Sequence, residues 1–217
     1  MKSRLHTLCV LGGFLLLCGF YALTECGRAE WAESFAVALP AWFLSLAVVW
    51  RAPDRASRGI ALALLFSGFG DLMGAKYNFL AQISFFAAAH LAYIASFLSR
   101  IRWRSFAYAG ICVLLLVFVF LALRIVPHID DPYERWFVLG YMVLIGGMGT
   151  SVVLQNRFPT AIALAAAILF ISSDAMIAWS RFVERIPHAT LWIMTTYYAA
   201  QYLFARCALS GHSLQKD

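Results

Sequence analysis

Long apolar segments separated by short polar connections are the feature that most constrains this chain. Hydrophobic residues make up 63% of its 217 residues and charged residues only 13%, which is too little polar material to cover a water-soluble globule. Each segment approaches the roughly 20 residues that a helix needs to cross a bilayer. Because no water is available there to satisfy an irregular backbone, and the runs are too continuous for barrel strands, each segment is expected to be helical.

We therefore predict an all-α fold, a polytopic membrane helical bundle with eight transmembrane helices that forms a single integral membrane domain over residues 1–217. The predicted spans are about 5–23, 34–50, 58–75, 78–98, 105–126, 135–155, 159–180 and 189–207. Lys2 and Arg4 precede the first span as they would in a secretory signal, but residues 24–27 offer no small-x-small cleavage pattern. We expect this span to be an anchor that is retained.

The basic residues predict the orientation of the bundle. Of the 17 lysines and arginines, 11 fall on the side of the N-terminus. These are Lys2, Arg4, Arg51, Arg55, Arg58, Arg100, Arg102, Arg104, Arg157, Arg206 and Lys216. By the positive-inside rule, and with an even number of spans, both termini are predicted to be cytoplasmic.

Several classes of function are not supported by the sequence. The net charge of +6 is spread over short connections and forms no basic patch or tail, so we expect no nucleic-acid partner. The cysteines and histidines show no CxxC or HExxH spacing, and we expect neither a metal nor an organic cofactor. A serine hydrolase is not indicated either, since the chain has no Gly-x-Ser-x-Gly motif.

Two carboxylates lie well inside predicted spans, Asp71 in the third and Asp174 in the seventh. Both helices would run outward from the cytoplasm, and the two residues would lie about 20 and 22 Å from that boundary. At one depth in a low-dielectric bundle, repulsion and desolvation would leave one group protonated as an acid and the other ionised as a base. The alternatives are that each Asp only joins helices by hydrogen bonds, or that Asp71, followed by Lys76, lies at the interface.

Other polar side chains in the spans are placed to complete a polar cavity near the two aspartates. They are Ser67, His90, Tyr93, Ser173, Tyr197, Tyr198 and Gln201. Tyr198 and Gln201 are three residues apart and share a helix face, as do His90 and Tyr93. A lone intramembrane histidine is as often a hydrogen-bonded packing residue as a catalyst, and both readings of His90 remain open.

Taken in order, these motifs resemble the YhhN family of eight-span membrane proteins. The resemblance rests on Ser67-x-x-Gly70-Asp71, His90-x-x-Tyr93, Ser173-Asp174 and Tyr197-Tyr198-x-x-Gln201. One departure is visible, because the family commonly has a Lys-Pro pair in the second span, where this chain has Leu39-Pro40. If that lysine helps to bind a lipid phosphate, the head-group preference of this chain differs.

The characterised members of the family are lysoplasmalogenases, and the resemblance implies the same hydrolysis of a vinyl-ether bond. The substrate would be an alkenyl glycerophosphoethanolamine or glycerophosphocholine, and the products a fatty aldehyde and the glycerophospho head group. Asp71 and Asp174 would be the catalytic acid/base pair, with the polar residues named above binding substrate or supporting the carboxylates.

The resemblance further implies a multi-pass protein of the bacterial inner (cell) membrane, whose partner is a lysophospholipid within the bilayer. Two alternatives to an enzyme are retained. A proton-coupled carrier would also use paired intramembrane carboxylates, whereas a non-catalytic lipid-binding membrane protein would need neither aspartate.

Overall fold

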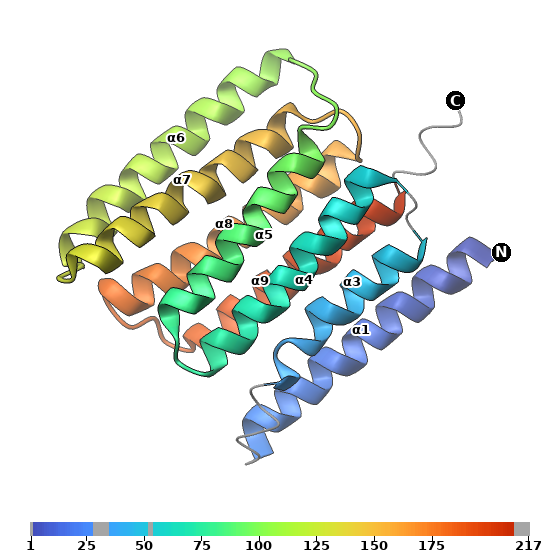
Figure 1. Ribbon diagram of the computed structural model, residues 1–217, viewed down its shortest axis with the longest axis horizontal. Coiled ribbons are helices and arrows are strands. Elements are labelled where there is room, and N and C mark those ends of the chain that lie inside the picture. The colour runs from blue at the N-terminus through green and yellow to red at the C-terminus, as the bar shows by residue number, and fades with distance from the viewer. Residues whose placement is uncertain (1, 28–34, 52–53, 211–217) are drawn as a thin grey trace.

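The computed structural model describes residues 2–27, 35–51 and 54–210, and this part of the chain contains eight α-helices and one short 3₁₀ helix (Figure 1). The α-helices are α1 (Lys2–Gly27), α3 (Leu39–Arg51), α4 (Arg55–Ala75), α5 (Phe79–Phe97), α6 (Ser105–Ile125), α7 (Pro132–Leu154), α8 (Thr160–Phe182) and α9 (Ala189–Ser210). The 3₁₀ helix, η1 (Val126–His128), continues α6. The prediction of an all-α chain is confirmed for the described residues.

The second predicted span, 34–50, differs from the structure at its start. Residue 34 lies outside the described residues, and a turn at Val37 and Ala38 precedes α3, which begins only at Leu39. Pro40 occupies the first turn of this helix, where its missing N–H needs no intrahelical partner. The turn leaves the Val37 carbonyl available to another helix.

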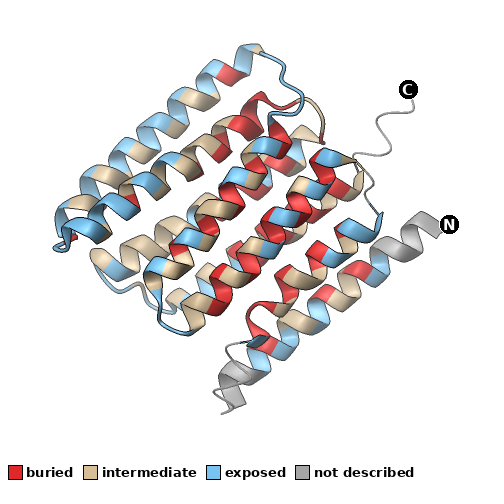
Figure 2. Ribbon diagram, viewed as in Figure 1, coloured by how far each residue is buried: buried red, intermediate tan, exposed pale blue. Residues whose placement is uncertain are grey.

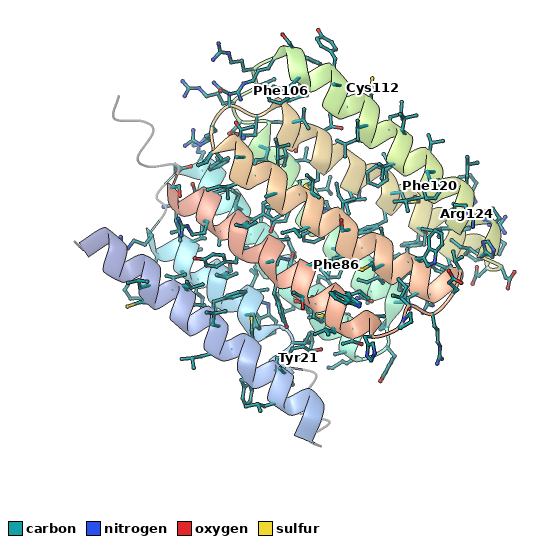
Figure 3. All side chains as sticks on the ribbon, turned by 180° about the vertical axis from the view of Figure 1, so that it is seen from behind. Tyr21, Phe86, Phe106, Cys112, Phe120 and Arg124 are labelled. Carbon is teal, nitrogen blue, oxygen red and sulfur yellow. The ribbon has the colours of Figure 1, made fainter. Side chains whose placement is uncertain are left out.

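The chain is a multi-pass membrane protein. Five helices in its described part are long and apolar enough to cross a bilayer, namely α4, α5, the joined α6 and η1, α7 and α8. The apolar stretch Leu8–Leu23 and helix α3 are shorter. Exposed residues cover much of α6 (Figure 2), and many of them are large and apolar, such as Phe106 and Phe120 (Figure 3). Such a surface is suited to lipid rather than to water.

Five of the helices form a closed ring. Going around it, α4 packs on α5, α5 on α7, α7 on α8, α8 on α9, and α9 returns to α4. Helix α6 lies outside this ring against α7 and α8, and on the opposite side α3 packs on α4 and α9 while α1 covers α3 (Figure 1). Buried aromatic side chains such as Tyr93, Phe97, Phe170 and Phe204 fill the ring.

At the end of the bundle where α4 begins, an ion pair links the loop between α3 and α4 to the loop between α7 and α8. The Asp54 carboxylate caps α4 by accepting hydrogen bonds from the backbone N–H and hydroxyl of Ser57, and Arg157 contacts it at 2.9 Å. Partial burial alone would raise the pKa of Asp54, but these hydrogen bonds and the Arg157 charge outweigh it and lower the pKa. The α3–α4 and α7–α8 connections are thereby held together.

Candidate active site

Each of the five helices in the ring directs at least one polar side chain toward another helix of the ring. Asp71 comes from α4, His90 and Tyr93 from α5, Tyr141 from α7, Asp174 from α8, and Tyr197 and Gln201 from α9. In an otherwise apolar bundle these groups are costly to bury unless they bind one another. They form separate hydrogen-bonded clusters rather than one network.

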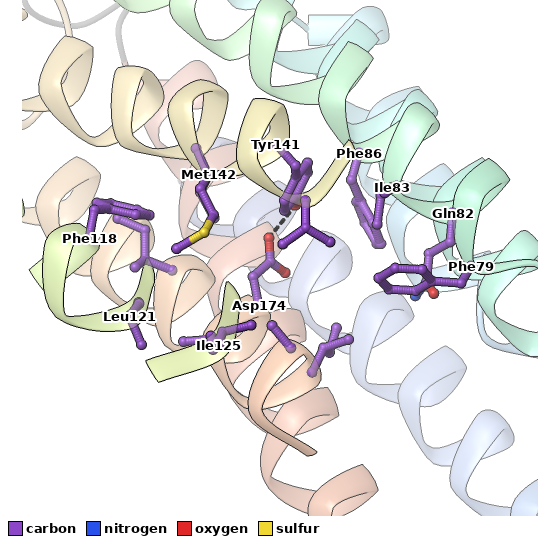
Figure 4. Close-up of a pocket in the computed structure, with 16 residues that line it drawn as sticks. Phe79, Gln82, Ile83, Phe86, Phe118, Leu121, Ile125, Tyr141, Met142 and Asp174 are labelled. Carbon is purple, nitrogen blue, oxygen red and sulfur yellow. Dashed lines mark hydrogen bonds between the residues drawn. The ribbon is translucent and has the colours of Figure 1, made fainter. Parts of the chain in front are cut away.

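The first cluster is built on Asp174. The Tyr141 hydroxyl donates to Asp174 Oδ2, as the dashed line in Figure 4 shows, and His90 Nε2 lies 2.9 Å from the same hydroxyl. A tyrosine hydroxyl has one proton, which here goes to Asp174, so His90 Nε2 carries a proton and donates to Tyr141. His90 Nε2 is 3.7 Å from Asp174 Oδ2, too far for a direct hydrogen bond. Asp174 Oδ1 is buried and has no hydrogen-bond partner among the described residues.

The second cluster is built on Asp71. The Tyr197 hydroxyl donates to Asp71 Oδ2 at 2.8 Å, and the aspartate is only 7% exposed. Asp71 is therefore buried between α4 and α9. Each of the two aspartates thus has its own tyrosine donor.

Aromatic rings occupy the space between the clusters. The Phe170 ring lies 5.0 Å from the His90 ring and 5.6 Å from the Tyr197 ring, measured between centroids. Phe86 packs edge-on against Tyr197 at 5.9 Å. A Cβ at Gly70 would come within 3.1 Å of the Phe86 ring, so a glycine beside Asp71 lets this ring approach α4 closely.

An apolar pocket with an empty volume of about 620 Å³, counting its opening, lies among α5, α6, α7 and α8. Most of its wall is aliphatic and aromatic, as the side chains drawn in Figure 4 show. The polar residues in the wall are Asp174, Tyr141 and Gln82. Phe86 is also a wall residue, and its contact with Tyr197 places the Asp71 cluster behind this ring. The pocket therefore combines an almost entirely apolar wall with one carboxylate.

The structure brings together several of the residues predicted from the sequence. Tyr93 donates to Gln201 Oε1 at 2.8 Å. The Gln201 Nε2 and Ser67 Oγ atoms are buried without a hydrogen-bond partner among the described residues. The Ser173 hydroxyl donates to the Ile193 carbonyl at 3.2 Å, which joins α8 to α9.

Tyr198 is directed away from the two aspartates. Its hydroxyl donates to the Val37 carbonyl at 2.8 Å, in the turn before α3. Its ring packs edge-on against Phe14 and Tyr21 of α1. Gln201, which shares a helix face with Tyr198 by sequence spacing, is directed instead toward α5 and Tyr93.

Tyr141 was not among the candidate residues from the sequence, although its depth is a usable signal. It lies nine residues after the start of α7, and Asp174 lies eight residues before the end of α8. Because consecutive helices joined by a short loop run antiparallel, these offsets place both residues about 12–14 Å from the same end of the bundle. The offsets do not give the rotation of each helix about its axis, which decides whether the side chains meet.

No cluster of three or more histidine, cysteine, aspartate or glutamate side chains able to hold a metal ion occurs among the residues that the structure describes. The polar groups of the ring are instead a carboxylate with a tyrosine and a histidine, and a carboxylate with a tyrosine. This set can hold, donate and accept protons.

Comparison with known proteins identifies relatives along nearly the whole chain. The lysoplasmalogenase TMEM86B of Sus scrofa is 31% identical over 220 residues, covering 94% of this chain and 88% of the relative. The lysoplasmalogenase TMEM86A of Bos taurus is 30% identical over 169 residues, covering 73% and 68%. A 43-residue stretch is 56% identical to TMEM86B of Homo sapiens.

No solved structure gives a significant match. The profile of the YhhN family matches residues 31–208, which include every residue of the two carboxylate clusters. The chain therefore belongs to the YhhN family.

Proposed function

We propose that this protein is a membrane-embedded hydrolase that cleaves the vinyl-ether bond of lysoplasmalogen, giving a fatty aldehyde and a glycerophosphoethanolamine or glycerophosphocholine. The observation that carries the proposal is the position of Asp174, held by Tyr141 and His90 in the wall of an apolar pocket. Lysoplasmalogenase is also the name of the relatives reported above, at about 30% identity.

The chemistry of an enol ether suits this arrangement. Proton transfer to the β-carbon of the vinyl group breaks the double bond and leaves an oxocarbenium ion on the α-carbon and ether oxygen. Water adds to the α-carbon and loses a proton, and the resulting hemiacetal splits into the aldehyde and the glycerol hydroxyl. The reaction consumes one water and returns the catalytic proton, as in the hydrolysis of glycosides, which also passes through an oxocarbenium-like state.

Asp174 is assigned as the acid because its carboxyl group lies in the pocket wall. Its Oδ2 is held by Tyr141, so the transferred proton would be on Oδ1, which has no partner in the described part of the protein. After the transfer, the ionised Asp174 would take a proton from the attacking water. Asp71, fixed by Tyr197, would supply the second carboxylate and, when ionised, stabilise the oxocarbenium ion.

The proposal includes eight crossings with both termini in the cytoplasm, in the bacterial inner membrane. The excess of arginine and lysine on the N-terminal side supports this orientation. The pocket then lies in the half of the bundle farther from the cytoplasm, since it is lined by the last turns of α6 and α8. No metal or organic cofactor takes part in the proposed steps.

The test follows aldehyde release by purified protein from lysoplasmalogen and from the matching saturated-ether lysolipid. We expect aldehyde from the first only. Asp174→Asn should lower kcat by 10²-fold or more, as expected for loss of a general acid, and Asp71→Asn should lower it by a smaller factor. Asp130→Asn, in an exposed connection, is the matched control.

Aldehyde from neither lipid would overturn the hydrolase proposal. Full activity in Asp174→Asn would overturn the site, and would support the alternative in which the aspartates only join helices. Movement of lysolipid across proteoliposomes without aldehyde release would favour a carrier.

A further inference from the structure

An arginine lies on the same face of α8 as Asp174, two helical turns farther along. Asp174 and Arg181 are seven residues apart, which corresponds to about 10 Å along the axis with nearly the same direction around it. The pocket wall on this helix includes Ile171, Asp174 and Ala178. This spacing continues directly to Arg181, beyond the end of the pocket.

Arg181 lies beside the pocket, and only some of its hydrogen-bond donors have a partner within the described part of the chain. Its guanidinium lies 4.0 Å from the ring centroid of Phe79, which is a pocket residue and the first residue of α5. Its Nη2 atom donates to Glu134 Oε1 at 2.7 Å, and 44% of its side chain is exposed. The other guanidinium donors of Arg181 have no hydrogen-bond partner among the described residues, so they are available to a second anion.

Neighbouring Arg135 is different, although it belongs to the same end of the bundle. Its Nε and Nη2 atoms both donate to the Ile129 carbonyl, at 3.1 and 2.6 Å. It fixes the connection between α6 and α7. Arg181, in contrast, contacts the pocket wall and still has guanidinium N–H donors available for another acceptor.

The distance along α8 from Asp174 to Arg181 is similar to the length of the substrate between its vinyl ether and its phosphate. Seven bonds separate the vinyl β-carbon from the phosphorus atom of a lysoplasmalogen. At about 1.2 Å of extended length per bond, the reach of an extended chain, they span about 8 Å. A lipid whose β-carbon meets Asp174 therefore brings its phosphate to the level of the Arg181 side chain.

We propose that Arg181 and Glu134 form the subsite for a zwitterionic phospholipid head group, an inference that rests on the proposed function. Arg181 binds the phosphate through its free donors, a geometry for which the planar guanidinium is suited. Glu134, which already pairs with Arg181, binds the ammonium group of the ethanolamine or choline. The tail then extends from Asp174 toward the Phe118 and Ile145 end of the pocket.

The test compares two vinyl-ether substrates that differ only in the head group, an alkenyl glycerophosphoethanolamine and the alkenyl glycerol without phosphate. Arg181→Gln should raise KM for the phosphate-containing lipid about tenfold, equivalent to about 1.4 kcal/mol, and leave kcat within twofold. Its KM for the alkenyl glycerol should not change. Arg185→Gln removes an exposed charge just beyond the same helix and should change neither KM.

Glu134→Gln should weaken selection of the ethanolamine lipid over an anionic alkenyl glycerophosphate. If Arg181→Gln leaves both KM values unchanged, or alters both substrates equally, the subsite is refuted and the ion pair only supports α7 and α8. Binding of the uncleavable saturated-ether lysophospholipid separates this proposal from the hydrolase proposal. Wild-type protein that binds this lipid through Arg181, yet releases no aldehyde from any vinyl ether, would retain the subsite and refute the enzyme.

Discussion

Replacing Tyr141 with phenylalanine tests how the Asp174 cluster works. The substitution removes one oxygen atom, which donates to Asp174 Oδ2 and accepts from His90 Nε2. The aromatic ring stays in the pocket wall, where its centroid lies 5.3 Å from that of His90. The change therefore removes two hydrogen bonds and leaves the shape of the pocket nearly intact.

The expected loss follows from the negative charge that Asp174 Oδ2, the acceptor, gains when Asp174 gives up its proton. A hydrogen bond to a charged group contributes about 1.5–3 kcal/mol, and each factor of ten in rate corresponds to about 1.4 kcal/mol. Tyr141→Phe should therefore lower kcat/KM by roughly 10- to 100-fold. His90 does not compensate, because its Nε2 lies 3.7 Å from Asp174 Oδ2, beyond hydrogen-bonding distance.

The assay is aldehyde release from lysoplasmalogen by purified protein, with thermal unfolding measured on the same samples. Tyr108→Phe makes the same chemical change on an exposed position of α6 and should leave kcat/KM unchanged. A Tyr141→Phe protein that unfolds normally and keeps kcat/KM within twofold of wild type would refute the role given to this hydroxyl. A loss that only parallels a loss of stability would refute it as well.

Two further predictions concern stability. Asp54→Asn should lower the free energy of unfolding by about 1 kcal/mol at neutral pH. Arg157 and the hydrogen bonds of the α4 cap lower the pKa of Asp54. The stabilising contribution of Asp54 is therefore present above the ordinary aspartate pKa and is lost as pH falls through the lowered pKa. Wild type and variant should therefore unfold at converging temperatures in acid, and a constant difference at all pH values would contradict this. Tyr198→Phe removes the bond to the Val37 carbonyl and should lower the unfolding free energy by about 1 kcal/mol with kcat unchanged; a fall in kcat at full stability would instead place Tyr198 in the site.

The helices were predictable because their apolar residues are continuous and their connections are short. Most boundaries agree with the structure to within a few residues. The exception is the second span, whose composition remains apolar across the turn at Val37 and Ala38. Hydropathy does not register such a turn, since every residue in it is compatible with lipid.

The candidate site was only partly predictable, for a geometric reason. Burial of Asp71 and Asp174 follows from their places in apolar spans. Their separate tyrosine partners do not, because residue offsets along antiparallel helices give depth without giving rotation. Tyr141 and Tyr197 become partners of the carboxylates only when the ring of five helices fixes both.

The apolar lining of the pocket has a consequence for how affinity must be measured. A lysolipid tail that enters it leaves one hydrocarbon environment for another, so its transfer releases no water and gains almost none of the free energy that an apolar ligand gains on leaving water. The apolar wall of the pocket therefore contacts the tail without contributing much to the binding free energy. Apparent affinity should scale with the mole fraction of substrate in the bilayer rather than with its bulk concentration, and preference among lipids should depend on the few polar atoms they meet.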